Sequence, residues 1–189
     1  MEEYSKDEVT PPDAFGIVEA GVFRSNIPYH ANFSFLRKLK LKTVVVLSPE
    51  RPVRAVTEFL DENGIDMIHL GKLTWSSASW KPMSDEMLKE GLQYVLDVER
   101  HPIMVTCTFG IYQTGTLVGC LRRLQNWNLN AILSEHNMYG GERTRYFNVL
   151  LIEIFDLDLV TLPLNLPEWF VRQQMMQAAE AMESKAVMK

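Results

Sequence analysis

Three short apolar runs, each followed by a stretch of helical character, constrain the fold of this chain most strongly. The runs are KTVVVLS at 42–48, IDMIHL at 65–70 and PIMVTC at 102–107. Continuous apolar runs of this length are typical of strands buried on both faces of a parallel sheet. Strands that alternate with helices form such a sheet through right-handed crossovers. The sequence therefore predicts an α/β fold with a central, mainly parallel sheet flanked by helices.

Local signals predict the remaining elements. FGIVEAGVFRSN, at 15–26, has two apolar runs around Gly21, the pattern of a hairpin. Pro52 is placed as the first residue of a helix that Gly64 ends, and Ser84 as the N-cap of the next helix. Further helices are expected in five places: one carrying Phe33, Leu36 and Leu39, one from Thr114, one near 130–138, one near 144–155, and one from about Pro167 to Met182.

Length and charge limit the class of protein. A chain of 189 residues with 47% hydrophobic residues is expected to form one domain, at 13–170, between a flexible tail at 1–12 and a C-terminal helix and tail at 171–189. The net charge of -5 argues against a nucleic-acid partner. No apolar run approaches the roughly 18 to 20 residues of a membrane helix. We therefore expect a soluble, cytoplasmic protein that binds neither nucleic acid nor membrane.

The chain has two cysteines, Cys107 and Cys120. They do not suggest a disulfide framework, and no Cys/His cluster suggests a metal site, so no metal and no cofactor is predicted. Cys120 would lie about six residues, roughly 9 Å, along the helix that begins near Thr114. A direct disulfide between the two cysteines is therefore not expected.

The segment VTCTFGIYQTG, at 105–115, places Cys107 at the carboxyl end of a buried strand and directly before a helix. Ligands of parallel sheets gather at such strand ends. A cysteine, five residues, an arginine and a Ser or Thr in this setting form the signature of cysteine-dependent phosphatases. The N–H groups of the loop and the helix N-terminus converge on a phosphate and lower the pKa of the cysteine, and the arginine holds the phosphoryl oxygens.

Gln113 stands where that arginine is required. Its amide is neutral and lacks the fork of donors, a loss worth on the order of 10³ to 10⁵ in rate, or about 4 to 7 kcal/mol. Cys107 remains as a residual nucleophile, and Thr114 could bond its sulfur. The other positions of the predicted phosphate loop are Thr108, Phe109, Gly110, Ile111, Tyr112 and Gly115. The apolar side chains among them should favour the neutral thiol.

No clear general acid accompanies the loop. The segment 71–82, which is expected to cover the site, contains no Asp or Glu, and Asp85 and Glu86 are better explained as solvated residues of a first helical turn. Lys72 and Lys81 in this segment could meet an anion, although an ordinary surface role is at least as well supported. Trp75 and Trp80 could form a lid or a partner contact, although packing against the core is at least as well supported.

Several multi-residue patterns resemble the plant and fungal atypical dual-specificity phosphatases, and within them the yeast proteins named for oxidant-induced cell-cycle arrest. The similarity covers about residues 12–170 and implies a dual-specificity or tyrosine phosphatase-like fold. The matching blocks, in order, are VFRSNIPYHANFSFLRKLKLKTVVVLSPE, HPIMVTC, GCLRRLQNWNL and IEIFDLDLV. The resemblance also implies that Arg24, with Ser25, supports the loop from beneath.

The departures from that family lie in the loop. Active members usually read His-Cys, two residues, then Gly-Lys-His-Arg-Thr-Gly. Gly110, Thr114 and Gly115 remain here, and four positions differ: Thr106 replaces His, Ile111 replaces Lys, Tyr112 replaces His and Gln113 replaces Arg.

Two further groups of side chains have predicted contacts. Arg122 and Arg123 are predicted to contact acidic helices or a carboxylate such as Glu50 rather than substrate. Met175 and Met176 indicate an apolar C-terminal helix that packs on the domain or on another chain, with the domain preferred.

The leading hypothesis is a pseudophosphatase that acts as a binding or complex subunit in stress or cell-cycle signalling, with paralogous phosphatase-like chains as partners. The alternative is an active cysteine-dependent phosphatase on phosphotyrosine proteins or inositol pyrophosphates, with Gln113, Lys72 or Lys81 holding phosphate. A third hypothesis is a sensor that binds a phosphorylated ligand without turnover. Three roles are open for Cys107 under these hypotheses: a buried hydrophobic residue, a redox or binding thiol, or a nucleophile. The loop around it is expected to be either open or collapsed.

Overall fold

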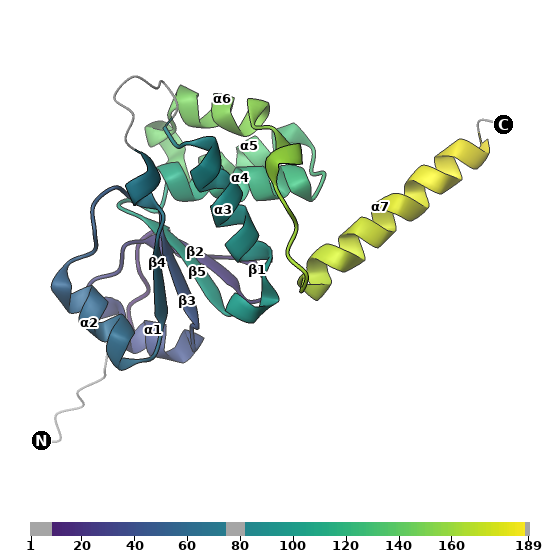
Figure 1. The fold of residues 1–189 in the computed structure, drawn as a ribbon. Helices are drawn as coiled ribbons and strands as arrows, with labels where there is room; N and C mark the ends of the chain where they lie inside the picture. Colours follow the sequence, from purple (N-terminus) through teal and green to yellow (C-terminus); the bar gives the residue numbers. More distant parts are fainter. Residues whose placement is uncertain (1–8, 75–81, 188–189) are drawn as a thin grey trace, which may run out of the picture.

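The computed structural model describes residues 9–74 and 82–187, and within them five strands form one sheet. The strands are β1 (Gly16–Glu19), β2 (Val22–Asn26), β3 (Thr43–Val46), β4 (Asp66–His69) and β5 (Ile103–Cys107). Their order across the sheet is β1-β2-β5-β3-β4. The hairpin pair β1 and β2 is antiparallel, and every other pair is parallel. The predicted α/β fold with a mainly parallel sheet is confirmed (Figure 1).

Helices pack on both faces of this sheet (Figure 1). On one face lie α1 (Phe33–Leu39) and α2 (Arg54–Glu62). On the other lie α3 (Asp85–Leu96) and α4 (Tyr112–Leu124), and α5 (Leu129–Gly140) and α6 (Tyr146–Ile154) pack against α4. Short 3-10 turns are η1 (His30–Asn32), η2 (Gly71–Thr74), η3 (Val98–Arg100), η4 (Gly141–Arg143) and η5 (Leu157–Leu159). The last helix, α7 (Glu168–Val187), extends away from the rest of the molecule (Figure 1).

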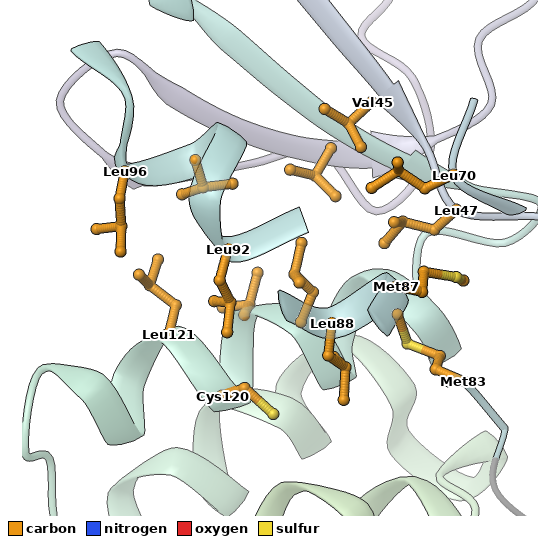
Figure 2. Close-up of a cluster of buried hydrophobic side chains, with 14 of the residues drawn as sticks. Val45, Leu47, Leu70, Met83, Met87, Leu88, Leu92, Leu96, Cys120 and Leu121 are labelled. Carbon is orange, nitrogen blue, oxygen red and sulfur yellow. The ribbon is translucent and has the colours of Figure 1, made fainter. Parts of the chain in front are cut away.

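Alternation along β3 divides the core into two clusters. Val44 and Val46 of β3 face α1 and α2, whereas Val45 faces α3 and α4. Figure 2 shows part of the second cluster, with Val45 and Leu47 on the sheet side and leucines of α3 and α4 on the helix side. Burying each large apolar side chain contributes about 1.5 to 3 kcal/mol. This packing fixes where β5 ends and α4 begins.

Most local predictions agree with the structure, but the predicted first residue of helix α2 is wrong. Gly21 and Gly64 have φ of 79° and 64°, as the hairpin and the helix cap require. Ser84 caps α3 by accepting a hydrogen bond from Met87 N. Pro52 is not the first residue of α2, because Val53 keeps an extended ψ of 156° and acts as the N-cap. The first turn closes only with the bond from Val56 N to Val53 O, at 2.9 Å.

The C-terminal helix does not pack on the domain through Met175 and Met176, so the preferred form of that prediction is wrong, whereas packing on another chain stays a prediction. Phe170 is buried, but Met175 and Met176 are 67% and 59% exposed. The contact to the body is made instead by Gln173 and Gln177, whose amides both donate to the carbonyl of Gln125. Beyond this first stretch the helix leaves the domain (Figure 1).

Both cysteines are free, in agreement with the expectation of no disulfide. Among the described residues, no helix has the length and apolar character needed to cross a membrane. The tail predicted at 1–12 lies mostly outside the described residues.

Candidate active site

Cys107 is the last residue of β5, between the ends of β2 and β3. Its carbonyl accepts a hydrogen bond from Ile27 N at 2.9 Å. Its exposed fraction is 0%, and its side chain belongs to the cluster between the sheet and α4. The thiol therefore lies within the core and does not meet solvent.

Gly110 shapes the backbone of the loop. With φ of 67°, it turns the chain so that its N–H donates to Cys107 O at 3.1 Å. Its carbonyl points down to Arg24 Nη2, at 2.8 Å. Because a trans peptide directs its N–H opposite to its C=O, the N–H of Ile111 points away from Arg24. The Gly110 N–H bonds within the loop, so it is not free to bind an anion.

Arg24 supports the loop from beneath, as predicted. It is 1% exposed, bonds the Gly110 carbonyl, and places its guanidinium 3.6 Å from the ring centre of Tyr139. Burial lowers the pKa of Arg24 to about 10, so it remains protonated at neutral pH. Ser25 does not bond the loop, and its hydroxyl instead faces Asn26 O and Met104 Sδ. Arg24 Nη2 is thus bound beneath the loop, whereas its buried Nε and Nη1 have no hydrogen-bond partner among the described residues.

His136 and Tyr139 of α5 complete the underside of the site, and sequence reasoning missed both. His136 is 3% exposed, and burial, followed by the nearby Arg24, lowers its pKa. A Cβ added to Gly115 would lie 2.8 Å from His136 Nδ1, so the start of α4 needs glycine for close packing. Nothing in the helical pattern of 130–138 marks these two side chains, because their partners come from β2 and α4.

The side chains of the loop differ in their burial and their contacts. Ile111 is 2% exposed, whereas Phe109 is 55% exposed and lies edge-on to Tyr112, with 5.9 Å between ring centres. Thr114 is buried, but its Oγ1 has no hydrogen-bond partner among the described residues, so the predicted bond to the sulfur is not made. Gln113, the second residue of α4, is half-buried. Thr108 is exposed and Gly115 is buried.

No lysine or arginine occurs in the sequence from Cys107 to Gly115. Two cations lie at the rim instead. Arg143, in η4, lines a hollow of about 320 Å³ together with Asp13, Asn26, Thr108, Phe109 and two other residues. The guanidinium of Arg145 lies 4.0 Å from the ring centre of Tyr112. Both are exposed and neither belongs to the loop.

The carboxylates near the loop differ from those considered in the sequence. Asp85 and Glu86 form the first turn of α3, as predicted. Burial raises the pKa of Cys120 to about 12, and Asp85 contributes in the same direction. Asp13 is the carboxylate that lines the hollow, with its Oδ2 3.5 Å from Asn26 Nδ2. Its position before the hairpin gave no signal in the sequence.

Arg122 and Arg123 play structural roles, as predicted, but Glu50 is not a partner. Arg122 pairs with Glu19 at 2.5 Å and with Glu135 at 2.8 Å. Arg123 donates to backbone carbonyls of the α6 region. Arg122 is far from Glu50 because ten residues of α4, about 15 Å of helix, carry it from the loop to the opposite end of the sheet.

Lys72 is exposed in η2, and the other covering residues named above, Trp75, Trp80 and Lys81, lie outside the described residues. Across residues 9–74 and 82–187, no group of three His, Cys, Asp or Glu residues could hold a metal ion.

Comparisons with known proteins agree with this geometry. A family model described as the tyrosine phosphatase family matches residues 9–173. The OCA1 protein of Mycosarcoma maydis is 40% identical over 80% of this chain and 96% of its own length. Inositol diphosphatase DSP4 of Arabidopsis thaliana is 36% identical over 83% and 79%.

Among solved structures, the core catalytic domain of the PP-IP phosphatase SIW14 from S. cerevisiae, in complex with citrate, is similar to this chain. Its TM-score is 0.73 at 34% identity, and the match covers 80% of this chain and 90% of that one.

Proposed function

The chain belongs to the tyrosine phosphatase family, and we propose that within it this protein is a pseudophosphatase that binds other chains without hydrolysing phosphate esters. One observation carries the proposal. Cys107, with an exposed fraction of 0%, lies beneath a loop whose arginine position is occupied by Gln113. We assign it a role as a subunit in stress or cell-cycle signalling, in the cytoplasm, with paralogous phosphatase-like chains as partners.

Chemistry at this site would need two changes at once. The sulfur would have to become accessible, because a nucleophile must reach the phosphorus atom, and a cation would have to stabilise the charge that develops in transfer. Loss of the arginine alone costs on the order of 10³ to 10⁵ in rate. Arg24 is disfavoured as a replacement because the Gly110 carbonyl and the Tyr139 ring hold it under the loop, although its Nε and Nη1 have no hydrogen-bond partner among the described residues.

The alternative is an active phosphatase on phosphotyrosine proteins or inositol pyrophosphates. The names of the relatives and the N–H of Ile111, which points away from Arg24, support it. In that case Arg143 or Arg145 would supply the missing charge after the loop rearranges. A phosphate sensor without turnover would use the same rim cations.

Steady-state turnover tests the proposal. We expect the protein to hydrolyse p-nitrophenyl phosphate and a diphosphoinositol phosphate no faster than its Cys107→Ser variant, because the thiol is buried and the loop lacks a cation. Phosphate release is measured for both proteins at matched concentration. Turnover that disappears in Cys107→Ser would establish the alternative.

Restoring the arginine alone is expected to achieve little. In Gln113→Arg we expect less than a tenfold increase in turnover, although a loop arginine is worth on the order of 10³ to 10⁵ in related phosphoryl transfers. The reason is that Cys107 stays buried and Thr114 does not bond its sulfur. The same assay compares Gln113→Arg with Gln113→Lys and with the double variant that also carries Cys107→Ser. A thousandfold gain that depends on Cys107 would show that the missing cation is the whole defect.

A further inference from the structure

A cluster of aromatic and cationic side chains borders the loop, and we name it the arginine–aromatic rim: Phe109, Tyr112, Arg143 and Arg145. Contacts join three of its members, and the fourth lines a hollow with one of them. Arg145 stacks on Tyr112, Tyr112 meets Phe109 edge-on, and Phe109 and Arg143 line the same hollow. Arginine and aromatic residues are the types that dominate binding energy in protein interfaces.

The arginine–aromatic rim lies near one carboxylate, Asp13, which lines the hollow beside Arg143. Three other arginines pair with carboxylates: Arg54 with Glu58, Arg100 with Asp66 and Asp97, and Arg172 with Glu168. Within the part of the chain that the structure describes, Arg143 and Arg145 pair with no carboxylate, although Glu142 adjoins Arg143 in sequence. The protein as a whole carries a net charge of -5, so this concentration of positive charge is local.

The stacking on Tyr112 prepares Arg145 for a carboxylate. The face of a guanidinium that lies on a ring is covered, but its N–H groups lie in its plane and remain available for two parallel bonds to a planar anion. The exposed Tyr146 and Phe147 follow directly in the chain, at 71% and 51% exposed, with 5.8 Å between ring centres. They offer apolar area beside the charge.

The hollow beside Arg143 contains acceptors as well. Asp13 contributes a carboxylate, and Asn26 Oδ1 is buried without a hydrogen-bond partner among the described residues. Such acceptors disfavour a ligand that carries only negative charge and suit one that also has N–H or O–H donors. A polypeptide supplies both, whereas a polyphosphate supplies only the anion.

From this charge complementarity we propose that the arginine–aromatic rim binds an acidic peptide segment of a partner protein. Carboxylates of the segment meet Arg143 and Arg145, an apolar side chain packs on Phe109 and Tyr146, and donors of the segment face Asp13 and Asn26. The inference rests on the proposed function, because a working phosphatase would need this opening for its substrate.

A selection from a phage-displayed library of random twelve-residue peptides tests the inference on the full chain. We expect selected peptides to be rich in Asp and Glu beside Leu, Phe or Tyr. A synthetic copy of the strongest peptide should bind with an affinity at least tenfold weaker in the double variant Arg143→Gln with Arg145→Gln. Binding should also weaken from 50 to 300 mM NaCl. Arg54→Gln, an equally exposed arginine on α2, is the matched control and should bind as the unmodified protein does.

Three outcomes would overturn the inference: no selected peptide, selected peptides without acidic residues, or equal binding by the double variant. A fourth outcome, measured by calorimetry, is that inositol hexakisphosphate binds more tightly than the peptide and that its binding needs the same arginines. That result would make the rim a phosphate site. Turnover measured on the same preparations separates the two proposals. Turnover that needs Cys107 would refute the proposal of a pseudophosphatase. Failed peptide binding without turnover would refute only the proposal that the arginine–aromatic rim binds a peptide.

Discussion

Gly110→Ala is expected to destabilise the protein by about 2 to 5 kcal/mol, the combined effect of a strained backbone and a steric clash. The residue has φ of 67°, a conformation that costs a residue with a Cβ about 1 to 2 kcal/mol. A Cβ there would lie 2.4 Å from Asn26 N and 2.6 Å from Ser25 C. Both are backbone atoms of β2, held by the sheet, so they cannot move aside. Urea unfolding followed by circular dichroism measures the loss.

Gly64→Ala is the matched control for this variant. Gly64 has φ of 64°, but nothing lies within 4 Å of the position of an added Cβ. The Gly64→Ala variant should therefore lose only the backbone contribution to the free energy of unfolding, about 1 kcal/mol. The difference between the two variants isolates the packing of the loop against β2. Equal losses would show that the loop does not rest on β2 as described.

Arg122→Met is expected to cost about 2 to 4 kcal/mol and to lower the melting temperature by roughly 4 to 16 °C. Arg122 is 4% exposed and holds Glu135 through two parallel bonds of 2.8 and 2.9 Å, Glu19 at 2.5 Å, and the carbonyl of Val18. Methionine fills similar space but leaves two carboxylates facing each other. The expected loss is below that of a fully dry pair because the side chains of Glu19 and Glu135 are 22% and 21% exposed.

Arg172→Met serves as the control for the second variant. Arg172 pairs with Glu168 one turn away on α7, and both side chains are largely exposed. Such a pair contributes about 0.3 to 0.5 kcal/mol, so the melting temperature should fall by no more than roughly 2 °C. Scanning calorimetry compares the two proteins. A small, similar shift in both would mean that Arg122 does not join β1, α4 and α5.

The sequence predicted the fold because its strands and turns have strong local signals. The β-branched run of β3 and the apolar run of β5 indicate burial directly, and Gly21 and Gly64 mark turns that need positive φ. The start of α2 was misplaced because the favourable position of Pro52 competes with the extended backbone of Val53. The exposure of α7 was not predicted, because methionines indicate an apolar helix but do not indicate whether another element packs on it.

The candidate site was predicted in part. The position of Cys107 follows from the strand before it, and the identity of Gln113 is read from the sequence alone. The contacts that decide the state of the loop are not local. Arg24 reaches Gly110 from 86 residues away, Tyr139 stacks on Arg24 from α5, and Asp13 enters the hollow from ahead of β1. Only the packing of distant elements brings these side chains together, and no pattern of spacing encodes it.

Rapid-quench mass spectrometry of Cys107 tests the central claim most directly. The protein is mixed with a diphosphoinositol phosphate or p-nitrophenyl phosphate, quenched between milliseconds and minutes, and its peptides are analysed for phosphocysteine. We predict that no phosphocysteine is detected at position 107 at any time, because the thiol is buried and no loop cation stabilises the transfer. The Cys107→Ser protein is the negative control. A phosphocysteine at position 107 that forms and decays as fast as phosphate is released would contradict this account.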